Sequence, residues 1–202
     1  MREAEVKRKT KETDIIVKLN IDGTGKSNID TGIGFLDHML ELFAFHGLFD
    51  LDVTAKGDLK VDIHHTNEDI GLVLGQAFKK ALGDKSGIKR NGFGSFPMEQ
   101  VTANATVDIS GRGSFTWPLI AGVSPDLIPV TKERYKAEYA EHFFDALSKN
   151  LGMNLNITIS GRSFDLHTTL EPVFKALGKA LDEATQIDPR RKGIPSTKGV
   201  ID

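Results

Sequence analysis

Two adjacent histidines and a nearby glutamate stand out in the stretch DIHHTNEDIG, which covers residues 62–71. Imidazole nitrogens and carboxylate oxygens, without sulfur, are ligands that suit manganese, iron or zinc. His64, His65 and Glu68 could therefore hold a metal ion. One such motif is weak evidence by itself, because a polar turn before a capped helix explains the same residues.

The second half of the chain repeats this pattern. FLDHMLELFAF aligns with YAEHFFDALSK without a gap, and the motif that follows aligns once one residue is dropped from the second copy. The aligned pairs are His38 with His142, His64 with His167, and Glu68 with Glu171. Core packing does not require histidine in both copies of two separate positions. The repeat therefore favours two related metal sites over two polar turns.

The composition excludes several other kinds of function. The 202 residues carry a net charge of −2, and none is cysteine. The small net charge gives no reason to expect nucleic acid or an acidic membrane surface as a partner. The lack of cysteine excludes disulfides, thiolate metal sites and cysteine nucleophiles. Since no apolar run approaches a membrane span or a signal peptide, we expect a cytoplasmic protein with no membrane and no nucleic-acid partner.

Hydrophobic patterns predict the same elements in both halves. Alternation predicts strands, and helical spacing predicts a shorter and a longer helix in each half. The expected strands are 17–21, 48–55, 105–109 and 155–160, and the expected helices are 35–45, 65–82, 137–150 and 168–185. Thr66 with Asp69 is typical of a capping box at the start of one long helix.

These elements suggest a duplicated half with the approximate order β-β-α-β-β-α. Each helix has an apolar face that must be covered. We therefore expect an α+β fold in which the helices pack between two four-stranded mixed sheets. We place the half-repeats at residues 1–90 and 91–202, within one compact domain overall.

Several segments, in their order along the chain, closely resemble imidazoleglycerol-phosphate dehydratase, an enzyme family of histidine biosynthesis. They are FLDHML, GDLKVDIHHTNEDIG, VDISGR, EHFFDAL, EPVFKALGKAL and PSTKG. The resemblance implies a hydro-lyase that dehydrates D-erythro-imidazole glycerol phosphate to imidazole acetol phosphate. It also implies two manganese ions, Mn²⁺, bridged by the imidazolate form of the substrate. Finally, it implies a 24-subunit shell whose active sites are shared between neighbouring subunits.

The resemblance assigns roles to individual residues of this chain. The metal ligands would be His38, His64, His65, Glu68, His142, His167 and Glu171. The catalytic residues would be Glu12, His64, Glu68, His167 and Glu171, with Glu12 transferring the carbon proton. The substrate and its phosphate would be held by Glu12, His38, His46, Arg90, Arg112, Lys175, Ser196, Thr197 and Lys198. The last three belong to a C-terminal tail that would fold over a site.

One position departs from the family pattern and leaves the activity open. The second motif of the family has two adjacent histidines, but here Thr168 follows His167, and the repeat independently pairs His65 with Thr168. A threonine hydroxyl is a poor manganese ligand, so we expect the second metal site to be weakened. Water could fill the place, or Asp165 could serve as a ligand in another register.

Three functions therefore remain as hypotheses. The preferred one is a working dehydratase with an altered second metal site. The alternative is a metal-binding relative with impaired or no catalysis, because Thr168 replaces an expected histidine ligand. A third is a metal-storing or structural assembly, which would bind metal but show no affinity for the phosphorylated imidazole substrate.

Overall fold

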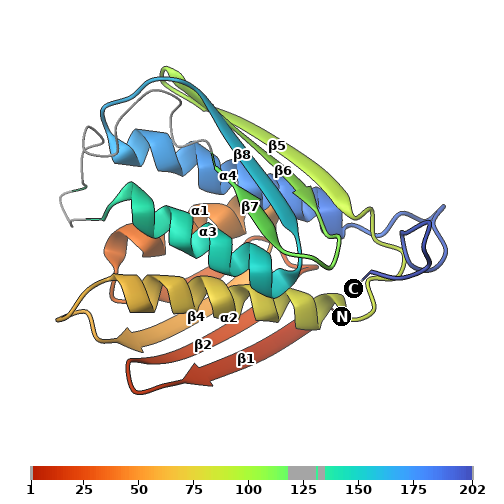
Figure 1. Cartoon of the computed structure of the whole chain (residues 1–202), viewed down its shortest axis with the longest axis horizontal. Helices are drawn as coiled ribbons and strands as arrows, with labels where there is room; N and C mark the ends of the chain where they lie inside the picture. Colours follow the sequence, from red (N-terminus) through yellow and green to blue (C-terminus); the bar gives the residue numbers. More distant parts are fainter. Residues whose placement is uncertain (1, 118–130, 132–134, 202) are drawn as a thin grey trace.

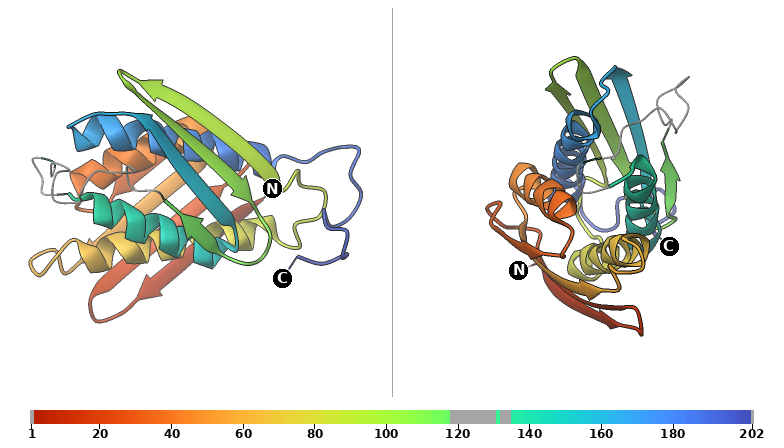
Figure 2. Two further views of the ribbon diagram at one scale, coloured as in Figure 1. Left: turned by 45° about the horizontal axis from the view of Figure 1, so that its top comes forward. Right: turned by 90° about the vertical axis from the view of Figure 1, so that its left-hand side faces the viewer.

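Two four-stranded sheets enclose four helices in the computed structural model, which describes residues 2–117, 131 and 135–201 (Figure 1 and Figure 2). The elements, in chain order, are β1 (Glu3–Lys9), β2 (Thr13–Asn20), β3 (Ser27–Asp30), α1 (Gly34–Gly47), β4 (Asp50–Gly57), α2 (His64–Leu82), β5 (Asn91–Met98), β6 (Val101–Asp108), β7 (Ser114–Thr116), α3 (Ala137–Leu151), β8 (Asn154–Gly161) and α4 (Leu166–Thr185). Among the described residues, no helix is both long and apolar enough to cross a membrane.

The two sheets have the same topology. Their strand orders are β1-β2-β4-β3 and β5-β6-β8-β7. In each sheet the last strand is parallel to its neighbour, and the other pairs are antiparallel. The registers also correspond, since Asn20 faces Asp50 in one sheet and Asp108 faces Asn154 in the other. The predicted α+β fold with two mixed four-stranded sheets is confirmed.

The expected order of elements within a half was wrong in one respect. Each half reads β-β-β-α-β-α, so three strands precede the shorter helix and one strand separates the two helices. The expected strands of the first half include neither β1 nor β3, and β3 has only four residues, of which three are exposed. Such a strand lacks the alternation of buried apolar residues by which strands are recognised in a sequence.

The helices form two parallel pairs between the sheets, α1 with α4 and α2 with α3 (Figure 2). Alternate residues of the central strands face them and are buried, as Val17 of β2 and Ala105 of β6 illustrate. Phe43 of α1 and Phe174 of α4 are almost fully buried between the layers. Each helix pair joins one helix from each half, so the core belongs to both halves.

Two repeat-equivalent glycines allow the paired helices to approach closely. A Cβ added at Gly75 of α2 would lie 2.7 Å from the carbonyl oxygen of Leu147 in α3. A Cβ at Gly178 of α4 would lie 2.5 Å from the carbonyl oxygen of Phe43 in α1. Both distances are too short for a real contact, so any larger residue would force the helices apart.

The two long helices start differently. At α2, a carboxylate oxygen of Asp62 accepts a hydrogen bond from the backbone N–H of His64 at 3.0 Å. The predicted capping box was wrong, because α2 already begins at His64 and Asp69 accepts from Arg8 and Thr13 instead. At α4, Asp165 is the N-cap residue, and its carboxylate accepts from the backbone N–H of Thr168 at 2.9 Å.

Candidate metal centre

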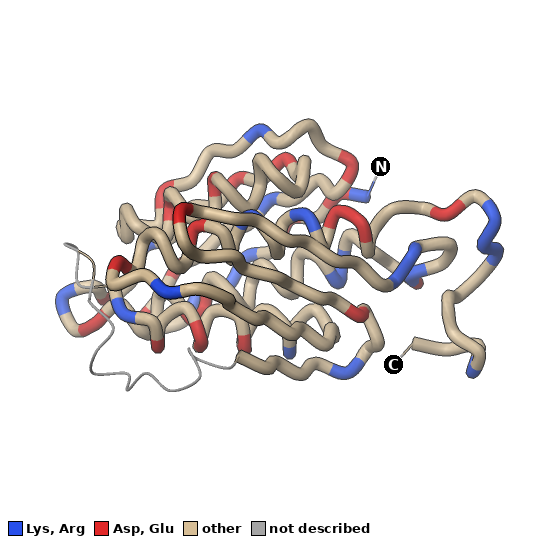
Figure 3. Tube along the Cα trace, turned by 90° about the horizontal axis from the view of Figure 1, so that it is seen from above, with Lys and Arg blue, Asp and Glu red and all other residues tan. Residues whose placement is uncertain are grey.

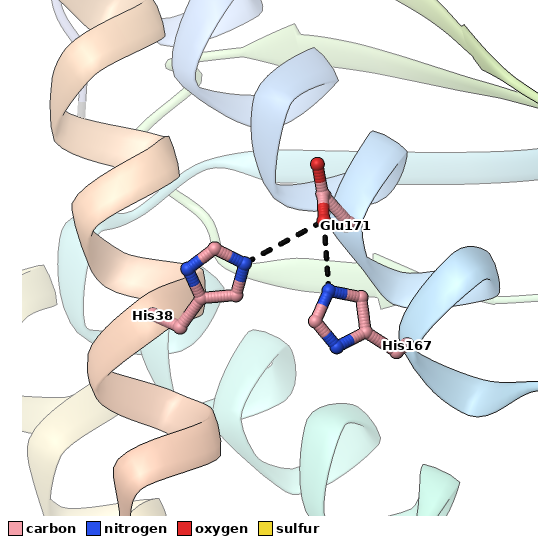
Figure 4. Close-up of side chains that lie close together, drawn as sticks. All are labelled: His38, His167 and Glu171. Carbon is pink, nitrogen blue, oxygen red and sulfur yellow. Dashed lines mark hydrogen bonds and ion pairs between the residues drawn. The ribbon is translucent and has the colours of Figure 1, made fainter.

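Three of the expected metal ligands converge between α1 and α4 (Figure 4). His167 and Glu171 stand one turn apart on α4, and their Nε2 and Oε2 atoms are 2.9 Å apart. His38 of α1 brings its Nε2 to 3.5 Å from the same carboxylate oxygen. One atom from each residue lies within 4.8 Å of the others. We name these residues the first trio; their nitrogen and oxygen donors suit a borderline or hard divalent cation.

The carboxylate of the first trio is held in its charged form. The side chain of Glu171 is only 13% exposed, and Lys175 Nζ contacts its Oε1 at 2.6 Å. Burial alone would raise the pKa of Glu171, but hydrogen bonds from Lys175 and His167 keep it below its ordinary value. Lys175, which the sequence assigned to phosphate, is thus engaged by the first trio.

A second trio, made of His64, Glu68 and His142, lies between α2 and α3. Nδ1 of His64 is 3.0 Å from Nδ1 of His142, while Nε2 of His64 is 3.5 Å from Oε2 of Glu68. Because two different nitrogens of His64 make these contacts, the three side chains form a chain and do not point to one place. The side chain of Glu68 is also 50% exposed.

Both trios draw on both halves of the molecule. In the first, a histidine of the first half meets a histidine–glutamate pair of the second half. In the second, His142 of the second half meets the pair His64 and Glu68 of the first half. The parallel packing of α1 with α4 and of α2 with α3 produces this exchange (Figure 1). The structure therefore brings six of the seven expected ligands into two groups related by the internal repeat.

The seventh expected ligand, His65, lies apart from both trios. Its Nδ1 is 3.0 Å from a carboxylate oxygen of Asp58 and 4.0 Å from one of Glu12. The hydrogen bond to Asp58 raises the pKa of His65. Sequence reasoning did not single out Asp58, although it follows directly on the strand that ends at Gly57.

Thr168, the equivalent of His65, is part of a helix cap. It is 6% exposed, and its hydroxyl donates to the same Asp165 oxygen that its backbone N–H contacts, at 2.8 Å. Hydrogen bonds from Thr168 help to keep the pKa of Asp165 low, against the opposing effect of burial. Both side chains thus serve the start of α4, and a ligand role for Asp165 stays a prediction.

Most of the expected phosphate-binding residues lie at the end of the molecule opposite to the trios. Arg90 makes hydrogen bonds to both carboxylate oxygens of Asp108, at 2.6 and 3.0 Å, and to the carbonyl oxygen of Pro195. Arg112 is exposed in the turn after β6. The first turns of α2 and α4 lie at the left of Figure 1, whereas the start of β5 and the C-terminal segment lie at the right.

The C-terminal segment carries several cationic residues along its length (Figure 3). Within it, Ser196 Oγ accepts a hydrogen bond from the backbone N–H of Lys198 at 3.2 Å, and Thr197 is exposed. His46 lies in the last turn of α1, where its ring packs edge-on against Phe96 with centroids 4.9 Å apart. Burial, followed by the charge of a nearby lysine, lowers the pKa of His46. Binding of phosphate by this set stays a prediction.

A buried network that sequence reasoning missed supports the second trio. The hydroxyl of Tyr135 donates to Asn67 Oδ1 at 2.7 Å, and Asn67 Nδ2 donates to the carbonyl oxygen of Tyr139 at 2.6 Å. The hydroxyl of Tyr139 donates to Asp62 at 2.8 Å, and burial raises its pKa to about 12. The network joins the first turns of α2 and α3 and so fixes the approach of His64 to His142.

Comparisons with known proteins identify the family of this chain. The profile of the family described as "Imidazoleglycerol-phosphate dehydratase" matches residues 31–181. Curated proteins of that name are 53% identical in Thermoanaerobacter sp. (strain X514) and 50% identical in Geobacillus sp. (strain WCH70), each alignment covering 100% of both chains.

Solved structures give the same answer. Imidazoleglycerol-phosphate dehydratase from Staphylococcus aureus superposes with a TM-score of 0.78 at 32% identity, covering 92% of this chain and 99% of that one. The enzyme from Pyrococcus furiosus also gives a TM-score of 0.78, at 34% identity, covering 96% of this chain and 99% of that one. Its fold, the matching family profile and its full-length relatives agree, so the chain belongs to the imidazoleglycerol-phosphate dehydratase family, a family of hydro-lyases.

Proposed function

We propose that this chain dehydrates D-erythro-imidazole glycerol phosphate to imidazole acetol phosphate in histidine biosynthesis. The observation that carries the proposal is the convergence of His38, His167 and Glu171 inside the region that matches the family. Two imidazoles and a buried carboxylate, directed at one place, form a site for a divalent cation. Full-length relatives named for this reaction support the assignment of the substrate.

We propose Mn²⁺ as the cation, with one ion at each trio. The donors present are nitrogen and oxygen, and the chain has no cysteine to favour a softer metal. Bound Mn²⁺ would supply positive charge beside the imidazole ring of the substrate and so make loss of its proton easier. The first trio needs little rearrangement for this role, whereas His64 of the second trio would have to turn away from one of its two contacts.

The protein's own carboxylates would handle the remaining proton. The side chain of Glu12 is 58% exposed and lies beside His65, so it can reach a bound substrate. We assign it the transfer of the carbon proton during loss of water. Lys175 would hold Glu171 in the orientation that faces His38 and His167.

The phosphate of the substrate would be held by residues of a neighbouring subunit. Within one chain, the trios lie at the end opposite to the start of β5 and the C-terminal segment (Figure 1). Residues at both ends can serve one substrate only if subunits associate. We therefore propose a 24-subunit assembly with shared sites. Removal of metal by a chelator should reduce its size, as light scattering would show; an unchanged 24-mer would contradict the role of metal in assembly.

The experiment that tests the proposed function is a turnover assay with imidazole glycerol phosphate and added Mn²⁺. It should be run on this chain and on the Thr168→His variant. Formation of imidazole acetol phosphate by the unmodified chain supports a competent dehydratase. If only Thr168→His is active, the fold is that of the enzyme but its second metal site has been lost. If neither forms product, the proposal is wrong.

Thr168 favours a second candidate, a relative that binds metal with impaired or no catalysis. Its hydroxyl donates to Asp165, and a neutral hydroxyl oxygen is a poorer manganese ligand than a histidine nitrogen. This candidate predicts one tight metal ion per chain and little turnover. Two tightly bound ions with full turnover would exclude it.

A cytoplasmic location stays a prediction.

A further inference from the structure

The contact between His65 and Asp58 leaves one ring nitrogen for another partner. Nδ1 of His65 is the nitrogen that lies 3.0 Å from Asp58 Oδ2, and it is also the one nearest to Glu12. A carboxylate accepts hydrogen bonds, so it stabilises the tautomer with hydrogen on Nδ1. The lone pair of Nε2 is then available to a cation.

The packing of β4 on α2 holds Asp58 in place for this contact. It follows Gly57, the last residue of β4, and a Cβ at Gly57 would lie 1.8 Å from the hydroxyl oxygen of Thr66 in α2. The end of the strand therefore packs directly on the first turn of the helix that carries His65. Because β4 packs on α2, the carboxylate of Asp58 and the imidazole of His65 are held at a fixed separation. The orientation of the His65 ring therefore does not depend on a free loop.

A purely structural role explains Asp58 poorly. At the start of α2, it is Asp62 that accepts a hydrogen bond from the backbone N–H of His64. The second carboxylate oxygen of Asp58, Oδ1, is buried and has no hydrogen-bond partner among the described residues. A buried carboxylate oxygen without a partner lowers stability, and such groups in native proteins often have a functional reason.

The second half lacks both members of the pair. Thr168 stands where the repeat places a histidine, and Arg162 follows Gly161 where Asp58 follows Gly57. The guanidinium of Arg162 lies 4.4 Å above the ring of Phe164. A histidine and its carboxylate are thus present together in one half and missing together in the other, as expected if they act as one unit.

We propose that Asp58 is a positioning residue that holds Nδ1 of His65 and thereby presents Nε2 of that ring to a divalent cation. The inference rests on the metal chemistry of the proposed function and adds to it a residue outside the expected ligand set. Carboxylates that orient metal-binding histidines typically change metal affinity by about 10–100-fold when removed.

The test is a Mn²⁺ titration, with free ion measured by electron paramagnetic resonance, on the intact protein and its variants. Asp58→Ala should weaken one class of sites, the class that includes His65, by about 10–100-fold. Asp58→Asn should weaken it less, because an amide oxygen still accepts from Nδ1–H without carrying charge. The matched control is Asp52→Asn, which changes an exposed carboxylate on β4, the strand that precedes Asp58, and it should bind as the unmodified chain does.

Two further measurements separate positioning from folding. In a His65→Ala background, Asp58→Ala should cause no additional loss of affinity, because the two residues act through one ring. The melting temperature of metal-free Asp58→Ala should not fall below that of the unmodified chain.

The positioning role would be overturned by any of three results. These are an unchanged Mn²⁺ affinity in Asp58→Ala, an equal loss of affinity on Asp58→Ala with and without His65, and a lower melting temperature of metal-free Asp58→Ala. If the unmodified chain binds no Mn²⁺, this proposal and the proposed metal chemistry fail together. If it binds Mn²⁺ with the expected variant pattern but does not turn over substrate, the positioning role stands and the dehydratase proposal fails.

Discussion

The two halves of the molecule make the same connection, from the fourth strand to the long helix, with different residues. After β4 the chain passes Asp58 and reaches His65 on α2. After β8 it passes Arg162 and reaches Thr168 on α4, where Asp165 caps the helix. The two halves follow the same backbone path. The carboxylate of Asp58 and the imidazole of His65 in the first half correspond to a guanidinium and a hydroxyl in the second. Equivalent folding therefore does not guarantee equivalent chemistry.

The two trios differ in a related way. The first directs three donor atoms at one place, and its glutamate is buried beside a lysine. In the second, His64 uses its two nitrogens for two different partners, and Glu68 is half exposed. We therefore expect unequal metal affinities, and the predictions below test that inequality from the largest expected effect to the smallest.

Removal of either trio's glutamate should have the largest effect. We expect Glu171→Ala and Glu68→Ala each to weaken one metal site by more than about 100-fold, since loss of a supporting residue alone costs 10–100-fold. Metal titration should show that Glu171→Ala abolishes the tighter class and Glu68→Ala the weaker one. Loss of the same class in both variants would contradict the existence of two distinct sites.

Restoration of the missing histidine should strengthen one class of sites. Thr168→His introduces an imidazole at the position equivalent to His65, and we expect one of the two classes of sites to gain about tenfold or more in Mn²⁺ affinity. The gain should be limited, because no carboxylate equivalent to Asp58 supports the new ring. A titration that remains unchanged would show that this position does not face a metal site in the assembly.

Substitution of the helix-contact glycines should disturb one trio at a time. Gly178→Ala and Gly75→Ala each insert a methyl group against a backbone carbonyl. We expect each to lower the free energy of unfolding by about 1–3 kcal/mol, and hence the melting temperature by roughly 2–12 °C. Metal titration of the same variants should show loss at the first trio for Gly178→Ala and at the second for Gly75→Ala. A loss spread equally over both classes would contradict independent helix pairs.

The cap of α4 gives a smaller effect that also settles the role of Asp165. Asp165→Ala removes the acceptor for the backbone N–H of Thr168 and should cost about 1 kcal/mol. Asp165→Asn should cost only a few tenths, because asparagine caps about as well. If Asp165 is only a cap, both variants should bind Mn²⁺ as the unmodified chain does, whereas weaker binding would identify a ligand.

The smallest expected difference between the halves is in their response to acid. Hydrogen bonds from Thr24, first its backbone N–H, and from Lys26 lower the pKa of Asp50. A carboxylate whose pKa is lower in the folded state stabilises the fold above its unfolded pKa of about 4, and this is lost as the pH falls through the folded value. The register-equivalent residue in the second sheet is Asn154, which does not titrate.

Chemical denaturation at several pH values would test this. Asp50→Asn should flatten the dependence of unfolding free energy on pH below about 4. Asn154→Ala is the matched control and should leave that dependence unchanged. If Asp50→Asn and the unmodified chain show the same dependence on pH, the carboxylate of Asp50 does not contribute to stability in this range.

The sequence predicted much of the fold but little of the contact geometry. The helix periodicity gave α2 and α4 to within two residues of their observed ends. In the first half, the hydrophobic pattern missed β1 and β3, which have one buried residue between them. The capping pattern misread Thr66, because the helix starts earlier than that pattern suggests. Local patterns carry no information about either departure.

The repeat identified candidate ligands but could not group them. Which histidine meets which glutamate depends on the parallel packing of helices from opposite halves, and that is a property of the tertiary structure. For the same reason the sequence did not reveal the contact of Asp58 with His65, or the network through Tyr135 and Asn67. Side chains far apart in the chain become partners only when the core is formed.

The exchange of ligands between halves has a consequence for how such a chain could arise. Since each trio needs a histidine from one half and a histidine–glutamate pair from the other, a half-length protein could build a trio only by pairing with a second copy of itself. Such a dimer would hold two identical trios. Gene duplication and fusion would then allow each copy to change alone, and Arg162 and Thr168 are changes that only a fused chain could confine to one half.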